Sequence, residues 1–262
     1  MNSNIKLWLS KKENKFQKYN YISNMEINEF LLKIKFLIFS DYYKHIDVID
    51  SLNKINSILN SFLIRLDYIG DERTKIINSF DEALIEIEKY LYLDLNHYLN
   101  SEPSIIDKKE FILSSLPFYA ILGYRVSNKL DLLRVNILPK IISEYIHSIS
   151  GIDINPKAKI GYGFVIDHGT GIVIGETTII GNNVKLFHGV TLGSKKITNI
   201  SELRGKKRHP TIEDNVIISS NSSILGDVII KKGAIVGASL IISRNVEENE
   251  IVRGTSNEGR IL

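Results

Sequence analysis

The chain of 262 residues contains no cysteine. This absence excludes disulfides, a thiolate nucleophile and zinc held by cysteine. Neither sign of charge dominates either, because 33 basic residues stand against 30 acidic ones and the net charge is only +3. Such an even balance of charges produces no strong electrostatic field that would attract nucleic acid. We therefore expect no nucleic-acid partner.

Long apolar runs are also missing. The most apolar early segment, residues 30–39, is interrupted by Lys33 and Lys35 and is too short to span a bilayer. Residues 1–15 carry no uninterrupted apolar stretch after their charges, so they do not resemble a signal peptide. The sequence therefore predicts a soluble, cytoplasmic protein that does not act at a membrane.

Glycine and proline are scarce in the first half of the chain. Only Gly70 and Gly123 precede residue 151, and no proline occurs before Pro103. Apolar residues recur there at spacings of three and four, over residues 49–66 and again over 76–91, which is the period of an amphipathic helix. We expect further helices at about 108–129 and 139–148. The sequence thus predicts an all-α domain over residues 1–148.

The second half has a period of six instead. The apolar residues that carry it are Ile154, Ile160, Ile166, Ile174, Ile180, Leu186 and Leu192, followed by Ile212, Ile218, Ile224, Ile230, Val236 and Ile242. A six-residue unit forms one flat side and one corner of a prism, and its apolar residue points inward. We therefore predict an α+β fold, in which the helical domain precedes a parallel β-helix of hexapeptide repeats over residues 149–246 and a tail over 247–262. Hexapeptide β-helices wind left-handed, although the period itself does not reveal the hand.

Two breaks in the repeat carry the chemical information. The step from Ile166 to Ile174 is eight residues long and contains His168, between an acidic residue and two glycines that would let a ligand approach the backbone. The step from Leu192 to Ile212 is twenty residues long and predicts a protruding basic loop over 194–210, which ends in Arg208-His209-Pro210. Upstream, Asp153 lies in a turn-like context and is a candidate to orient the His168 imidazole. The histidines match no zinc-ligand spacing, and we expect no metal.

The motifs around these breaks resemble the serine O-acetyltransferase family. The matching segments are Gly151–Pro156, Ile166–Thr177, Gly189–Gly193 and Lys207–Ile212, and the likeness continues upstream through Pro117, Tyr124-Arg125 and Glu144–Ser148. The resemblance implies homotrimers, sometimes paired into hexamers, with active sites in the grooves between neighbouring left-handed β-helices. It also implies transfer of the acetyl group of acetyl-CoA to the hydroxyl of L-serine, which gives O-acetyl-L-serine for cysteine synthesis.

The resemblance also assigns roles to individual residues. His168 matches the general base and Asp153 the carboxylate that pairs with it. Arg208 and His209 match the pair that recognises the amino acid, and Asp167 matches a residue that meets its ammonium. The corresponding matches along the pantetheine arm of CoA are Gly193, Ser220 and Ala238. The chemistry agrees, because an imidazole can take the hydroxyl proton near neutral pH and a carboxylate on its other nitrogen fixes the tautomer.

Departures from the family pattern leave the acceptor open. Glu102-Pro103-Ser104 replaces an Asp-Pro-Ala element that reaches the acceptor, so Glu102 is a candidate for substrate binding with one extra methylene. The others are Asn155 in place of His, His188 in place of Gln, and Tyr119 and Leu122 in place of polar residues. Another hydroxyl acceptor, such as homoserine or a sugar, is the alternative. A non-catalytic scaffold is the third hypothesis, although it would not need the intact catalytic and recognition residues together.

The C-terminus resembles the tails by which some family members dock into O-acetylserine sulfhydrylase. Those tails usually end in Ile, whereas this one ends in Ile261-Leu262. The alternative is a polar tail without a partner after Glu247.

Overall fold

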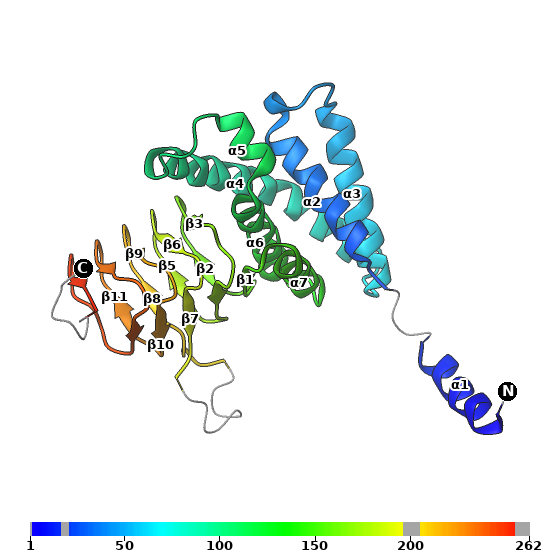
Figure 1. Cartoon of the computed structure of the whole chain (residues 1–262). Coiled ribbons are helices and arrows are strands. Elements are labelled where there is room, and N and C mark those ends of the chain that lie inside the picture. Colours follow the sequence, from blue (N-terminus) through cyan, green and yellow to red (C-terminus); the bar gives the residue numbers. More distant parts are fainter. Residues whose placement is uncertain (1, 17–20, 196–204, 255–262) are drawn as a thin grey trace. The chain divides into compact units, whose positions relative to one another are not determined.

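The structure is a computed structural model that describes residues 2–16, 21–195 and 205–254. Helices occupy the first half of the chain and short parallel strands the second (Figure 1). The chain forms two compact units, residues 1–81 and 82–262, and the division falls within helix α4 (Gly70–Ser101). Among the helices of the described residues, none combines the length and apolarity needed to cross a membrane.

The first unit is helical. It contains α1 (Ser3–Phe16), α2 (Asn24–Ile38), a 3-10 turn (Ser40–Tyr42), α3 (Val48–Arg65) and the start of α4. Its core is aromatic, because the Phe30 ring lies 5.7 Å from the Phe62 ring and 5.9 Å from the Phe80 ring, measured between centroids. All three side chains are fully buried. Phe62 and Phe80, predicted to lie on the apolar faces of their helices, are thus part of this core, whereas Ile49 at the start of the first predicted face is 74% exposed.

The second unit begins with the rest of α4 and continues through α5 (Lys108–Ser114), α6 (Leu116–Leu132) and α7 (Leu138–Ser150). The prediction of a single helix over 108–129 is wrong, because the helix is interrupted at Ser115. This residue is both the C-cap of α5 and the N-cap of α6. The reason is Pro117, which has no N–H to donate and whose ring would collide with the preceding turn of a continuous helix. The expected helix at 139–148 is confirmed by α7.

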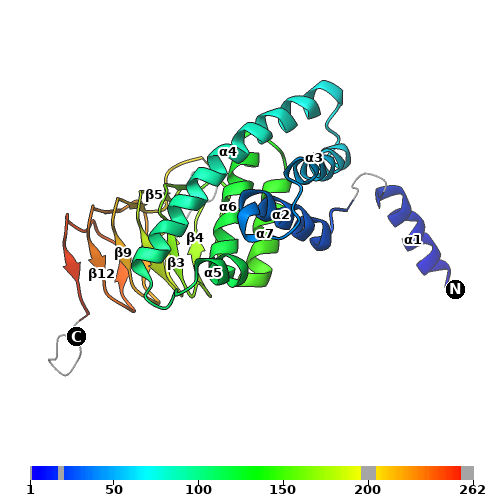
Figure 2. The ribbon, with the colours of Figure 1, turned by 90° about the horizontal axis from the view of Figure 1, so that it is seen from above.

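The strands form a parallel β-helix, as the period of six predicts. They are β1 (Asp153–Ile154), β2 (Lys159–Ile160), β3 (Val165–Asp167), β4 (Val173–Ile174), β5 (Ile179–Ile180), β6 (Lys185–Phe187), β7 (Thr191–Gly193), β8 (Thr211–Ile212), β9 (Ile217–Ile218), β10 (Ser223–Leu225), β11 (Ile229–Ile230), β12 (Ile235–Val236), β13 (Ile241–Ile242) and β14 (Ile251–Val252). The inward apolar column is buried throughout, from Ile154 at 4% exposed to Ile242 at 7%. Figure 2 shows the coils stacked side by side.

Three sheets make the sides of the prism. Sheet A contains β1, β4, β7, β10 and β13, sheet B contains β2, β5, β8 and β11, and sheet C contains β3, β6, β9, β12 and β14. The chain visits A, B and C in turn, so each coil passes two edges that matter below. We call them the C–A edge, where sheet C leads into sheet A, and the A–B edge, where sheet A leads into sheet B.

The β-helix extends beyond the boundary expected at residue 246. Strand β14 pairs in parallel with β12, with Ile235 opposite Ile251. Residues 196–204 of the expected loop and residues 255–262 of the expected tail lie outside the described residues.

Buried polar groups of the helices hold the first coil of the β-helix. Arg125 of α6 forms a two-pronged ion pair with Asp94 of α4, both bonds 2.7 Å long, and Asp94 also accepts a hydrogen bond from the backbone N–H of Phe164 at 2.8 Å. The Tyr98 hydroxyl donates to the carbonyl of Ile166 and accepts from its N–H, both at 2.8 Å. These contacts fix the end of α4 against β3, where the candidate site lies.

Candidate active site

His168 occupies a tight turn at the C–A edge, directly after β3. The N–H of Gly169 donates to the carbonyl of Asp167 at 2.7 Å, and His168 itself has a φ of 59°, in the left-handed region that non-glycine residues rarely adopt. The two extra residues of the eight-residue step are accommodated in this turn. As a result the His168 side chain projects outward and is 78% exposed.

The turn borders a groove of about 790 Å³ between the helices and β3. Its lining includes Tyr98 near the end of α4, Glu102 directly after that helix, Phe111 from α5, and both Asp167 and His168. Three of the residues predicted from the sequence, Glu102, Asp167 and His168, therefore lie together at one site. A groove of this size is within the range of small-molecule sites.

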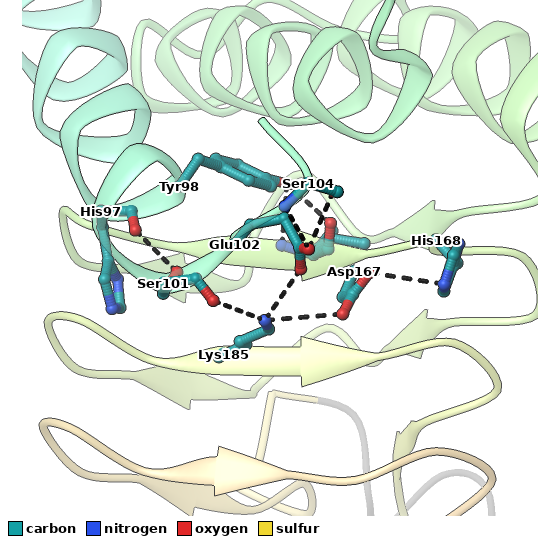
Figure 3. Close-up of polar contacts among 9 residues, drawn as sticks. His97, Tyr98, Ser101, Glu102, Ser104, Asp167, His168 and Lys185 are labelled. Carbon is teal, nitrogen blue, oxygen red and sulfur yellow. Dashed lines mark hydrogen bonds and ion pairs between the residues drawn. The ribbon is translucent and has the colours of Figure 1, made fainter. Parts of the chain in front are cut away.

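A lysine that sequence reasoning missed lies at the centre of this group (Figure 3). Nζ of Lys185, on β6, is 3.3 Å from Glu102 Oε2 and 3.5 Å from Asp167 Oδ2. On its other side, Oδ1 of Asp167 is 3.7 Å from Nε2 of His168. The pKa of Glu102 is lowered, first by the hydrogen bond from the Ser104 hydroxyl and also by Lys185, so its carboxyl group is ionised at neutral pH.

Asp153 opens β1 on the outer face of sheet A. Its register partner is Val173, the residue at which the His168 turn enters β4. Within the part of the chain that the structure describes, Asp153 forms no hydrogen bond or ion pair with His168, whose carboxylate contact is Asp167. The expected Asp153–His168 pair therefore stays a prediction.

Arg208 and His209 lie at the other edge, the A–B edge, just before β8. The Arg208 guanidinium is ion-paired with Glu176, and this lowers the pKa of the Glu176 carboxyl. The Thr177 hydroxyl accepts hydrogen bonds from the backbone N–H groups of Arg208 at 3.0 Å and His209 at 3.1 Å. Glu176 and Thr177 thus hold Arg208 and His209 in place, a role that no spacing in the sequence indicated.

The imidazole of His209 is packed rather than free. The residue is 7% exposed, and its ring lies directly over Gly175, where an added Cβ would be 2.2 Å from the ring's Cδ2. Burial first, and then the positive charges of Arg208 and Lys207, lower the pKa of His209. Its neutral form therefore dominates at neutral pH.

The three residues expected along the pantetheine arm divide between the two edges. Ser220 and Ala238 follow β9 and β12 at the C–A edge, in the coil positions equivalent to His168 and His188, as the registers of β3, β6, β9 and β12 require. Gly193 ends β7 at the A–B edge. One edge of the prism therefore carries His168, His188, Ser220 and Ala238 in consecutive coils.

The arrangement supplies an exposed imidazole beside two carboxylate side chains and a separate arginine–histidine pair across sheet A. These are groups for moving a proton and for holding a charged small molecule. Within the described ranges, no set of three or more His, Asp and Glu side chains is placed to hold a metal ion.

Comparisons with known proteins converge on one family. The chain is 34% identical over 187 residues to a plasmid-encoded serine acetyltransferase of Synechococcus elongatus, covering 70% of this chain and 59% of the relative. It is 39% identical over 174 residues to the serine acetyltransferase of Bacillus licheniformis, covering 66% of this chain and 77% of the relative. The chain thus spans about three fifths of the first relative and about three quarters of the second. No protein-family model matches the chain.

Solved structures agree. A crystal structure of serine acetyltransferase isoform 3 from Entamoeba histolytica in complex with cysteine superposes with a TM-score of 0.79 at 26% identity, covering 93% of this chain and 86% of that one. The Neisseria gonorrhoeae serine acetyltransferase in complex with serine gives 0.62 at 27%, covering 80% and 96%. A serine acetyltransferase in complex with CoA gives 0.61 at 27%, covering 79% and 84%.

Proposed function

Because the chain belongs to the serine acetyltransferase family, we propose that it transfers the acetyl group of acetyl-CoA to the hydroxyl of L-serine. The relatives bear that name, and the solved neighbours have serine or CoA bound. The observation that carries the proposal in this chain is the exposed His168 imidazole, held in a strained turn at the mouth of a groove that also contains Asp167 and Glu102.

His168 acts as the general base. Its imidazole removes the proton of the serine hydroxyl while the oxygen attacks the thioester carbon of acetyl-CoA. The carbon–sulfur bond then breaks, and the imidazolium returns the proton to the sulfur, which releases CoA and O-acetyl-L-serine. General base catalysis of this kind contributes about 10²–10⁴-fold in rate. Asp153, beside the strand that the His168 turn enters, would accept the other ring N–H and stabilise the imidazolium.

Residues at the C–A edge and at the A–B edge bind the two charged groups of the acceptor. Asp167 and Glu102 provide negative charge for the ammonium of serine, and Arg208 provides a planar fork for its carboxylate, with His209 beside it. In a single chain these two sets lie at different edges of sheet A. We therefore propose that the chain forms a homotrimer, alone or paired into a hexamer, in which the C–A edge of one copy faces the A–B edge of the next.

The same groove between copies would hold acetyl-CoA. Ser220 and Ala238 continue the line of His168 along the C–A edge, at coil spacings of about 4.8 Å. Their small side chains leave room for an extended pantetheine arm that delivers its thioester to His168. Gly193 of the neighbouring copy would face this arm from the A–B edge. We propose no metal in this chemistry and a cytoplasmic location for the enzyme.

Release of the CoA thiol from acetyl-CoA tests the proposal. L-serine, homoserine and a hydroxylated sugar are supplied as separate acceptors, and we expect turnover with L-serine. In His168→Ala we expect kcat to fall by about 10²–10⁴-fold with the circular dichroism spectrum unchanged. His45→Ala, an exposed histidine of the first unit, is the matched control and should retain full activity. Full activity of His168→Ala would refute the assignment of His168 as the general base. A preference for homoserine over L-serine would show that homoserine is the acceptor.

A mixing experiment tests the site between copies. His168→Ala and Arg208→Ala each leave every site of their own oligomers incomplete. In randomly mixed oligomers about a quarter of the sites combine an intact His168 from one copy with an intact Arg208 from the other, because the interface is heterologous. We expect co-expression to restore activity at low serine concentration. If mixed oligomers are no more active than the separate variants, both residues act within one chain.

A further inference from the structure

Lys185 is bound in the way that a substrate ammonium would be bound. Its Nζ lies 3.2 Å from the carbonyl oxygen of Ser101, 3.3 Å from Glu102 Oε2 and 3.5 Å from Asp167 Oδ2. An alkylammonium has three N–H donors; two of them form hydrogen bonds, to Ser101 and Glu102, and the ammonium is also ion-paired with Asp167. The side chain is only 10% exposed. Figure 3 shows the ammonium between the two carboxylates, with His168 beyond Asp167.

The β-helix does not itself require a lysine at this position. The register partners of Lys185 in the neighbouring coils are Val165 and Ile217, and a side chain of either kind would continue the outer face of sheet C. Neighbouring side chains orient the lysine instead. Its Nζ lies 4.8 Å from the centre of the Phe187 ring, at cation–π distance. Lys185 therefore contacts both carboxylates of the site, and also the Ser101 carbonyl and the Phe187 ring.

We infer that Lys185 is a specificity-determining residue that weakens the preference of the site for an acceptor with an α-ammonium. The inference rests on the proposed function, which gives Glu102 and Asp167 to that ammonium. Two carboxylates and one internal ammonium leave a net charge of −1 where two unpaired carboxylates would have −2. L-serine must share these oxygens with Lys185, while a hydroxy acid without an amino group meets less unbalanced negative charge.

Removal of the lysine charge leaves the carboxylates in place. Glu102 Oε1 still accepts from the Ser104 hydroxyl at 2.9 Å, and the Glu102 N–H still donates to the carbonyl of Tyr98 at 3.0 Å. Asp167 belongs to β3, whose register with β6 is set by backbone hydrogen bonds. The loss of Lys185 therefore adds attraction for a cation without dismantling the groups that provide it.

Calorimetry of acceptor binding to the CoA-saturated protein tests this inference without turnover. The ligands are L-serine and 3-hydroxypropionate, which has the same hydroxyl and carboxylate but no amino group. In Lys185→Met we expect the Kd of L-serine to fall about tenfold, as the removal of one like charge at this range predicts after solvent screening. The Kd of 3-hydroxypropionate should not fall, so the ratio of the two constants should shift by about tenfold.

Two further variants separate charge from structure. Lys185→Arg retains the charge and should keep the wild-type ratio. Lys129→Met removes a lysine that is ion-paired with Glu86 at 2.6 Å, outside the site, and should also keep it. The inference is overturned if Lys185→Met leaves the ratio unchanged or shifts it toward 3-hydroxypropionate, because Lys185 would then only hold the groove together. CoA release by the wild type with L-serine is measured in parallel, and its absence would refute the proposed function while the binding ratio still decides the role of Lys185.

Discussion

The hydroxyl oxygen of Thr177 lies 2.9 Å from Nδ1 of His209. The backbone N–H of Thr177 also donates to this nitrogen, at 3.1 Å. Nδ1 is therefore an acceptor, and because burial and the charge of Arg208 lower the pKa of His209, the ring is neutral with its proton on Nε2. Thr177 thus determines which nitrogen of His209 can donate a hydrogen bond.

Thr177→Val should weaken acceptor binding. The variant keeps the shape of the side chain but loses the hydroxyl that meets Nδ1 of His209 and the N–H groups of Arg208 and His209. We expect the KM for L-serine to rise about tenfold, equivalent to about 1.4 kcal/mol for the lost hydrogen bonds, with a smaller change in kcat. Thr177→Ser keeps the hydroxyl and should remain close to wild type. Equal kinetics of the valine and serine variants would show that the hydroxyl does not position the pair.

Gly175→Ala should displace the His209 ring. A methyl group at residue 175 would lie 2.2 Å from Cδ2 and 2.3 Å from Nε2 of the imidazole, so the ring must leave its place. We expect kcat/KM for L-serine to fall at least about tenfold while the melting temperature changes little, since the ring can turn toward solvent. Gly70→Ala is the matched control, because a Cβ there meets nothing within 4 Å. An unimpaired Gly175→Ala enzyme would exclude His209 from acceptor recognition.

The sequence predicts the β-helix well because its period is a local property. An inward apolar residue every sixth position specifies the coil, and the eight-residue step around His168 marks the turn without any knowledge of the helices. The split of the helix at Ser115 has a local signal as well, because Pro117 disfavours a continuous helix there.

The charged cluster at the site had no such signal. Lys185 and Glu102 are 83 positions apart and meet only because α4 docks against the first coils through Tyr98, Asp94 and Arg125. From the sequence of β6 alone, a lysine directly before the inward-facing Leu186 is expected only to lie on the outer face of the sheet. His168 and Arg208 lie at different edges of the prism because of the order in which the chain visits the three sheets. Counting the six-residue repeats along the sequence is enough to predict this placement.

Tyr98→Phe should destabilise the second unit and the site with it. The lost hydroxyl leaves the N–H and the carbonyl of Ile166 without their partner in a buried position. We expect the free energy of unfolding to fall by about 2 kcal/mol, measured by urea titration. Because Ile166 directly precedes Asp167, kcat/KM should fall as well. Tyr90→Phe, on the same helix, is the comparison. If both variants unfold alike, the Tyr98 hydroxyl does not anchor α4 to β3.

Glu26→Gln should make the first unit less stable in a way that depends on pH. Glu26 accepts hydrogen bonds from Arg65 at 2.7 Å and from the Ser23 N–H at 2.9 Å in the capping box of α2. The Arg65 hydrogen bond first, and then those from Ser23, lower the pKa of Glu26 to about 2. Half-exposure reduces the value of such a pair, and we expect a loss of about 1 kcal/mol at pH 7 in the free energy of unfolding.

The sign of the pH dependence follows from the lowered pKa of Glu26. The stabilisation is fully present above the ordinary carboxyl pKa of 4.5 and is lost as the pH falls from there through about 2, since the unfolded chain takes up the proton first. Urea unfolding followed by circular dichroism should therefore separate wild type from Glu26→Gln at pH 7 and bring them together as the pH approaches 2. Glu29→Gln, an exposed neighbour on the same helix, should match wild type at pH 7. A difference between wild type and Glu26→Gln that persists undiminished in acid would mean that the ionised carboxylate is not what stabilises the start of α2.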